Sequence, residues 1–347
     1  MKERCITQDM PVRRTITRRQ FLAAGALGLA VILPAGYLAL DALVRRHPGL
    51  LRETTAGWRK HPNNPVLGGA LGTCFDISLL HLDGMYRMWF SWRPRGSIAV
   101  VESQDGVHWS EPQIALGPDP NSNWEKIVNR PSVIRLADGY HLWYTGQVED
   151  RSAIGYAFSP DGFSFQRQRA RPVLMAEHPW EDVAVMCPHV VYDQASGLFR
   201  MWYSGGEQYE PNAIGYATSL DGLAWVRHER NPIFQPEPSN YWEQQRVTAC
   251  QVIPTGNWHL MFYIGFSNVH TAQIGLARSK DGISGWERHP ANPIVRPSFY
   301  GWDADAVYKP YAIFDGRQWL LWYNGRCSTK EQIGLAIHLG EDLGFEK

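Results

Sequence analysis

The sequence contains the same short pattern five times, and this repeat constrains the fold more than any other feature. The pentapeptide MWFSW at 88–92 returns as LWYTG, MWYSG, MFYIG and LWYNG. Its aromatic landmarks are spaced 54, 59, 60 and 60 residues apart, at Trp89, Trp143, Trp202, Phe262 and Trp322. A second motif travels with it, from IAVVESQDG at 98–106 to a truncated IGLAIHLGE at 333–341. A fixed period of this length indicates one supersecondary unit built five times.

Each unit is predicted to form four short β-strands. An apolar strand with a proline comes first, the aromatic pentapeptide second, the IGYA-type motif third, and a strand ending in Asn-Pro fourth. Asp-Gly pairs such as Asp138-Gly139 and Asp161-Gly162 separate these strands, and Asp-Gly between alternating apolar residues is typical of a hairpin. The pattern therefore predicts an all-β fold, a five-bladed β-propeller with four-stranded antiparallel blades.

The two ends of the repeat complement each other. The last unit stops after its third strand, at 333–338, so that its fourth strand is missing. The segment Trp58–Val66 (WRKHPNNPV) precedes the first unit, yet it matches the fourth-strand segment Trp286–Ile294 (WERHPANPI). We expect this N-terminal strand to complete the last blade, because the pairing would remove an exposed sheet edge.

The first fifty residues fall outside the repeat and have the pattern of a targeting segment. The sequence TRRQFL at 17–22 leads into an uncharged run from Gln20 to Leu40 and is typical of a twin-arginine export signal. The run has about 20 residues, which is long enough to span a bilayer. We expect a signal at 1–50 and a propeller at 51–347, exported to the periplasm or the cell exterior. If the signal is not cleaved, we expect residues 20–44 to anchor the protein in the inner membrane.

Composition limits the partners and cofactors. The formal net charge is zero, which argues against a nucleic-acid partner because phosphate neutralisation requires a surplus of basic residues. The five cysteines have no CxxC spacing, so no zinc or redox motif is indicated. We expect no cofactor and no metal.

The loops predict which face of the propeller carries a ligand. In an up-and-down blade the tight Asp-Gly turns all lie on one face. The opposite face receives the loops between strands two and three, which are longer and polar, for example at 147–151 and 207–210. Binding residues concentrate on such loops over a rigid scaffold, so we expect the site on this face.

Alignment of the innermost strands on the aromatic landmark selects three charged residues. Asp76, Arg130, Ala249 and Lys309 each lie 13 residues before their landmark, and Cys187 takes the same place if a two-residue insertion is allowed. A charge near the axis that breaks the repeat is a better functional candidate than a residue that keeps it. Asp76, Arg130 and Lys309 meet this criterion, with a solvated ion cluster that holds the channel together as the alternative.

Further candidates differ in how strongly the repeat explains them. Tryptophan-acid pairs recur in four units, which favours a structural role for Trp124-Glu125, Trp180-Glu181, Trp242-Glu243 and Trp302-Asp303. Asp182, Asp305 and Arg246 are not shared between units and are more informative. His189 is as consistent with a packed core residue as with a ligand contact. The remaining candidates for ligand binding are Asn129, Glu207 and Tyr308.

The units resemble the five-bladed propeller glycoside hydrolases, broadly families 43, 32, 62, 117 and 130. The segment 75–86 (FDISLLHLDGMY) is similar to the first-blade segment of family 43, and the resemblance implies that Asp76 is the general base. The segment 186–189 (MCPH) is similar to the third-blade segment that carries the general acid. Met186 stands at the acid's position and cannot transfer a proton. Arg130 stands where a family 43 second blade usually carries an aspartate.

The resemblance implies a glycosidase, but it leaves the second carboxyl group to be found. Ordinary glycoside hydrolysis needs two carboxyl groups, which lie about 6.5–9.5 Å apart in an inverting site. We expect hydrolysis of a poly- or oligosaccharide with Asp76 as the base and Asp182, or Glu181, as the acid. Arg130 and Lys309 beside Asp76 would also suit a uronate sugar, or phosphate in a phosphorylase resembling family 130. The missing acid equally permits a non-catalytic carbohydrate-binding propeller.

Overall fold

The described part of the chain is built from short antiparallel strands, which confirms the all-β prediction. The computed structural model describes residues 53–209 and 211–345, and the predicted export signal lies outside these residues. The first strand set contains β2 (Cys74–Leu82), β3 (Met85–Trp92), β4 (Ser97–Ser103) and β5 (Gln113–Leu116). The fourth contains β14 (Arg246–Thr255), β15 (Trp258–Asn268), β16 (Thr271–Ser279) and β17 (Glu287–Arg288).

The second and third strand sets share one eight-stranded sheet. The second set contains β6 (Ile127–Leu136), β7 (Gly139–Val148), β8 (Arg151–Ser159) and β9 (Gln166–Arg167). The third set contains β10 (Ala184–Asp193), β11 (Leu198–Gly206), β12 (Pro211–Ser219) and β13 (Val226–Arg227). Among the described strands, the two sets are joined by one parallel pairing, between Ala184 of β10 and Ser152 of β8. The strands within each set pair antiparallel.

The fifth strand set combines the two ends of the described chain. It contains β18 (Ala306–Phe314), β19 (Gln318–Cys327), β20 (Lys330–Leu339) and β1 (Arg59–Lys60), and β1 pairs antiparallel with β20. The regular strand is shorter than the predicted one at 58–66, although the backbone N–H groups of His61 and Val66 still donate to Leu335 and Ile333 of β20, each at 2.8 Å. Three short 3-10 helices complete the fold, at Gly69–Leu71 (η2), Arg93–Arg95 (η3) and Pro179–Glu181 (η4).

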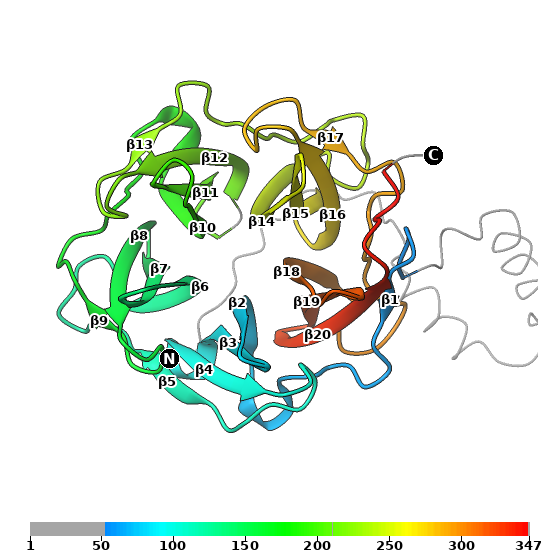
Figure 1. Ribbon diagram of the computed structural model, residues 1–347, viewed down its shortest axis with the longest axis horizontal. Helices are drawn as coiled ribbons and strands as arrows, with labels where there is room; N and C mark the ends of the chain where they lie inside the picture. The colour runs from blue at the N-terminus through cyan, green and yellow to red at the C-terminus, as the bar shows by residue number, and fades with distance from the viewer. Residues whose placement is uncertain (1–52, 210, 346–347) are drawn as a thin grey trace, which may run out of the picture. The chain divides into compact units, whose positions relative to one another are not determined.

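The five strand sets lie around a common centre, with β2, β6, β10, β14 and β18 innermost (Figure 1). Five apolar clusters fill the spaces between successive sets. One of them joins the last set to the first, through Leu79 and Met88 on one side and Trp322 and Leu335 on the other. Burial of apolar surface between sets supplies most of the stabilisation, since each sheet alone would leave both faces in water.

The tryptophan landmark is explained by a contact between successive sets. The indole Nε1 of Trp89 donates to the Gly162 carbonyl at 2.8 Å, and Trp143 and Trp202 make the same bond to the next Asp-Gly turn. Trp322 in the fifth set donates to Gly106 in the first at 2.9 Å. Gly106 has φ 73°, and a Cβ there would lie 2.6 Å from the Trp322 ring, so both its backbone and the close approach require glycine.

A buried trio of an acid, a base and a tyrosine explains the recurring tryptophan-acid pairs. In the third set, Arg227 Nε donates to Glu181 Oε1 at 2.8 Å and the Tyr203 hydroxyl donates to the same oxygen at 2.7 Å. The second and fourth sets have the same trio, Glu125–Arg167–Tyr144 and Glu243–Arg288–Tyr263. In the fifth set the base is Lys60 of β1, whose Nζ lies 2.6 Å from Asp303 Oδ2.

No helix within the described residues is long and apolar enough to cross a membrane. The described strands belong to one compact unit that begins at Glu53.

Candidate functional site

The innermost strand of every set has a β-bulge at the aligned position. The bulge residues Asp76, Arg130, Cys187, Ala249 and Lys309 have φ between 38° and 54°, and the strand register shifts at each of them. The alignment, including the insertion before the third landmark, is therefore confirmed. Left-handed backbone is uncommon for residues other than glycine, and such conformations cluster at functional sites. A bulge also redirects a side chain relative to its strand.

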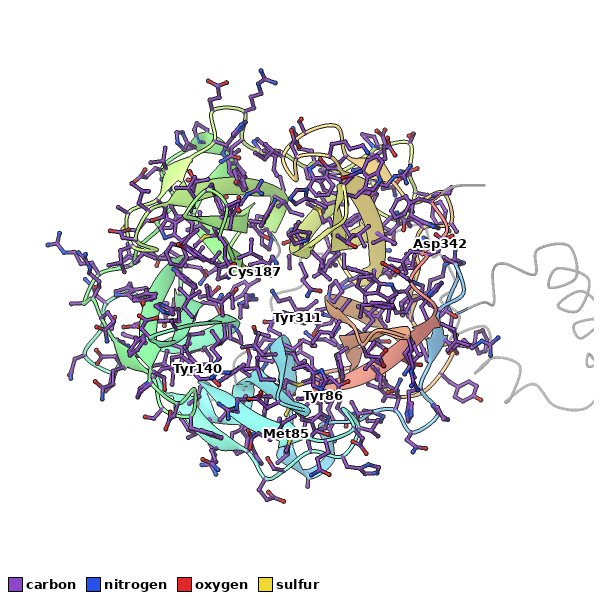
Figure 2. All side chains as sticks on the ribbon, viewed as in Figure 1. Met85, Tyr86, Tyr140, Cys187, Tyr311 and Asp342 are labelled. Atoms are coloured by element: carbon purple, nitrogen blue, oxygen red, sulfur yellow. The ribbon has the colours of Figure 1, made fainter. Side chains whose placement is uncertain are left out.

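The centre of the described fold contains a cavity of about 610 Å³. It is lined by the beginnings of the innermost strands and by the facing ends of the second and third strands, with loop residues between those two strands in the first three sets, on the face that the loop argument predicts. Cys187, one of the bulge residues, lies on its wall and near the centre in Figure 2. The charged side chains on the wall are Asp76, Arg93, Lys126, Arg130, Glu149, Arg326 and Glu331.

Asp76 is the most buried carboxyl group on the cavity wall, with 4% of the residue exposed. Its Oδ1 accepts a hydrogen bond from Asn324 Nδ2 at 3.4 Å, and its Oδ2 lies 3.5 Å from Arg130 Nε. Oδ2 accepts no hydrogen bond from any residue that the structure describes. Burial raises the pKa of Asp76 above its usual value, and the positive charges of Arg130 and Lys309 oppose this rise.

Glu331 is a second carboxyl group on the same wall, and the sequence reasoning missed it. It comes from β20 and accepts hydrogen bonds from the Tyr308 hydroxyl and from Arg93 Nη2, the latter at 2.9 Å. Glu331 lies close enough to Asp76 for its negative charge to raise the pKa of Asp76 further. A signal was present: two residues before the third motif the other sets have Gly96, Ser152, Asn212 and Ala272, so that Glu331 breaks the repeat with a charge.

Four of the predicted site residues lie on the cavity wall, namely Asp76, Asn129, Arg130 and Tyr308. Arg130 Nη1 donates to the Asn129 side-chain oxygen at 2.9 Å, so the two residues form one polar group. Burial holds the pKa of Tyr308 well above its usual value, and the charge of Glu331 adds to the effect. Lys309 is buried, with 4% exposed, and its charge affects the pKa of Asp76 and of the Cys187 thiol.

The two residues expected to supply the acid lie elsewhere. Glu181 is fully buried in its trio with Arg227 and Tyr203, outside the cavity wall. Although burial opposes ionisation, hydrogen bonds from Arg227 and neighbouring groups hold the pKa of Glu181 below its usual value. Asp182 is exposed and does not line the cavity. Glu181 therefore has the structural role that the repeated tryptophan-acid pairs favoured.

The other predicted ligand contacts also lie off the cavity wall. His189 bonds to the Val252 carbonyl through Nε2 at 2.9 Å, and burial lowers its pKa to about 4, which fits the packed-core interpretation. Arg246 forms an ion pair with Glu207 at 2.9 Å. Asp305 accepts the backbone N–H of Ser328 and so orders a loop.

Other groups on the wall are suited to a polar ligand. Thr248 is 3% exposed, lines the cavity, and its hydroxyl has no hydrogen-bond partner among the described residues. Trp92 and Tyr209 add aromatic surface, and Tyr209 is 66% exposed. Within the described part of the chain, no group of three or more His, Cys, Asp or Glu side chains is placed to hold a metal ion.

Known proteins share this architecture. A Mycobacterium tuberculosis protein described as uncharacterized is 28% identical over 293 residues, which cover 80% of this chain and 93% of that protein. The 1,2-beta-oligomannan phosphorylase of Thermoanaerobacter sp. is 32% identical over 137 residues, 35% of this chain and 43% of its own length. A solved thermostable family-43 glycoside hydrolase has a TM-score of 0.65 at 19% identity, covering 80% of this chain and 93% of that one, and this likeness concerns the fold.

A protein-family model also matches the sequence. The model described as the glycosyl hydrolases family 32 N-terminal domain matches residues 78–274, which is more than half of the chain. The matched region begins within β2 and ends within β16, so it covers the strands that carry most of the cavity wall. The chain therefore belongs to the glycosyl hydrolase family 32 N-terminal domain family.

Proposed function

We propose that this protein hydrolyses a glycosidic bond of a poly- or oligosaccharide in the central cavity, with inversion. The observation that carries the proposal is the Asp76 carboxyl group. It is buried on the cavity wall, and its Oδ2 has no hydrogen bond from the described residues. Such an oxygen can accept a proton from a water molecule that attacks the sugar ring.

The surroundings of Asp76 support its role as the general base. Burial raises its pKa, which makes the carboxylate a stronger base than an exposed aspartate. Arg130 and Lys309 limit the rise and favour the ionised form. Because the ionised form is required, activity should fall as the pH drops through this pKa. The acidic limb of the rate profile should therefore lie at higher pH than for an ordinary aspartate.

Glu331 takes the place of Asp182 and Glu181 as the proposed acid. It shares the cavity wall with Asp76, whereas neither of the predicted acids does. When Glu331 gives its proton to the leaving oxygen, the carboxylate that remains can accept hydrogen bonds from Tyr308 and Arg93. These charged and polar donors stabilise the product state of the proton transfer.

The test is product release from a panel of neutral and uronate-containing oligosaccharides, with wild type and Asp76→Asn compared. The substitution keeps the shape but removes the base, so turnover should fall by about 100- to 10,000-fold. Asp182→Asn is the matched control, because the same chemical change is made at an exposed carboxyl group outside the cavity. Turnover by Asp76→Asn within a few-fold of wild type would remove Asp76 from the mechanism.

A phosphorylase is the second candidate function. Its support is the similarity to the 1,2-beta-oligomannan phosphorylase, together with the cations Arg130 and Lys309 whose charges act on Asp76. The same panel decides between the two, because a phosphorylase requires inorganic phosphate and releases a sugar phosphate. A wild type that binds a glycan but releases nothing, with or without phosphate, would favour the carbohydrate-binding propeller.

The architecture and the cellular location belong to the same proposal. We assign the five strand sets to five propeller blades, with β1 as the outer strand of the last one. The pairing of β1 with β20 and the Trp322–Gly106 bond support this assignment. The twin-arginine pattern at 17–22 supports export to the periplasm or beyond, where a polysaccharide would be met. Retention at the inner membrane through residues 20–44 is the alternative.

A further inference from the structure

Four of the five bulges are held by a side chain from the preceding strand set. The backbone N–H of Arg130 donates to Ser91 Oγ at 2.8 Å, that of Cys187 to Thr145 Oγ1 at 3.1 Å, and that of Ala249 to Ser204 Oγ at 2.8 Å. The N–H of Asp76 donates to Asn324 Oδ1 at 3.1 Å. All four acceptors occupy the fourth position of the aromatic pentapeptide.

The acceptor changes from a hydroxyl to an amide at the one bulge that carries a carboxylate. Ser91, Thr145 and Ser204 offer a hydroxyl, whereas Asn324 offers a carboxamide with one acceptor and two donor hydrogens. Its Nδ2 lies 3.4 Å from Asp76 Oδ1, so that one side chain bonds both the backbone and the carboxylate of Asp76. The orientation of the amide is fixed, because the opposite assignment would set a donor against the Asp76 N–H.

Asn324 is fully buried and does not line the cavity, so it does not contact a ligand there. We propose that Asn324 is a positioning residue for Asp76, which holds the bulge and fixes the orientation of the carboxyl group. This inference rests on the proposed role of Asp76. With Oδ1 bonded to the amide, Oδ2 is turned toward Arg130, whose Nε lies 3.5 Å away.

The charges around Asp76 come from four other elements. Arg130 of β6 and Lys309 of β18 are cationic, Glu331 of β20 is acidic, and Arg93 of η3 contributes a further positive charge. Asn324 adds no charge, so its effect on Asp76 comes through hydrogen bonds and orientation alone. A donor to the carboxylate favours the ionised form, and its removal therefore raises the pH at which Asp76 ionises.

The most informative variant is Asn324→Ser, because serine occupies the equivalent position in the first and third strand sets. A serine oxygen can accept the Asp76 N–H as Ser91 and Ser204 do for their bulges, but it replaces the amide that reaches Oδ1. We expect kcat to fall by up to about 100-fold through misplacement of the base, with KM changed much less. The acidic limb of the kcat profile should move to higher pH.

The test has a control variant, Ser204→Ala, and a readout that does not depend on activity. Ser204→Ala removes the equivalent support from Ala249, a bulge without charge, so it should leave the acidic limb in place. The ionisation of Asp76 is also followed by carbon NMR of labelled carboxyl groups in the resting protein, where Asn324→Ser should raise the midpoint. An unmoved NMR midpoint would overturn the positioning role. A wild type inert on every glycan would instead overturn the proposed function, and the NMR result would still decide the role of Asn324.

Discussion

At the scale of single residues, the site depends on carboxyl groups with different environments. Asp76 is buried beside Arg130, and one of its oxygens has no hydrogen bond from the described residues. Glu331 is held by Tyr308 and Arg93, which both donate to it. Under the proposed function, one of these carboxyl groups acts as the base and the other as the acid.

The acid role of Glu331 is tested by dependence on the leaving group. An aryl glycoside with an acidic leaving group scarcely needs protonation, whereas a natural oligosaccharide does. Glu331→Gln should therefore lose about 100- to 10,000-fold in turnover of the oligosaccharide and retain most of its turnover of the aryl glycoside. Asp182→Asn should leave both rates near wild type. Equal loss on both substrates for Glu331→Gln would argue against an acid role.

The sequence singled out Asp76 and Arg130, which line the cavity, but not Glu331, which lines it too, and the reason is physical. Asp76 is found by counting back from the aromatic landmark, since both lie on one hairpin. The contact between Glu331 and the wall around Asp76 forms only when the last strand set meets the first. For Glu181 the repeated tryptophan-acid pairs favoured a structural role, but its partner Arg227 lies 46 residues away, so the buried trio itself could not be read from the local pattern.

At the scale of elements, the short outer strands supply the basic residues of the buried ion pairs. Arg167, Arg227 and Arg288 each lie in a two-residue strand and neutralise a buried acid of the same or the adjoining set. Lys60 does so from β1, although it lies at the other end of the chain. The pattern WRKHPNNPV predicted that this segment is an outer strand because it aligns without a gap with the fourth-strand segment WERHPANPI, but it could not give the length of the pairing.

Removal of Lys60 should destabilise the fold through its buried partner. Asp303 is fully buried, and Lys60→Met would leave its carboxylate with the Tyr323 hydroxyl at 3.2 Å as its remaining donor. Loss of one member of a buried ion pair costs about 3–5 kcal/mol, which urea unfolding measures. Arg59→Met is the matched control, since Arg59 is the exposed neighbour in the same strand. If both variants unfold at the same urea concentration, β1 does not stabilise the last strand set.

At the scale of the whole molecule, the candidate site combines residues from the first and the last strand set. Asp76 lies on β2 of the first set, while Asn324 and Glu331 lie on β19 and β20 of the last. The bond from Trp322 to Gly106 and the apolar cluster around Leu79 and Leu335 join these two sets. Contact between the first and last strand sets therefore places Asp76 and Glu331 on one cavity wall, and the repeat within single units could not predict this placement.

The central claim is that a glycosidic oxygen sits between Asp76 and Glu331, and a crystal structure with a bound oligosaccharide tests it most directly. Asp76→Asn protein that retains the fold should hold the uncleaved sugar in the cavity. The account predicts position 76 on the side of the attacking water and Glu331 within hydrogen-bond distance of the glycosidic oxygen, with the two side chains about 6.5–9.5 Å apart. An oligosaccharide bound outside the cavity, or one whose glycosidic oxygen meets no carboxyl group, would contradict it.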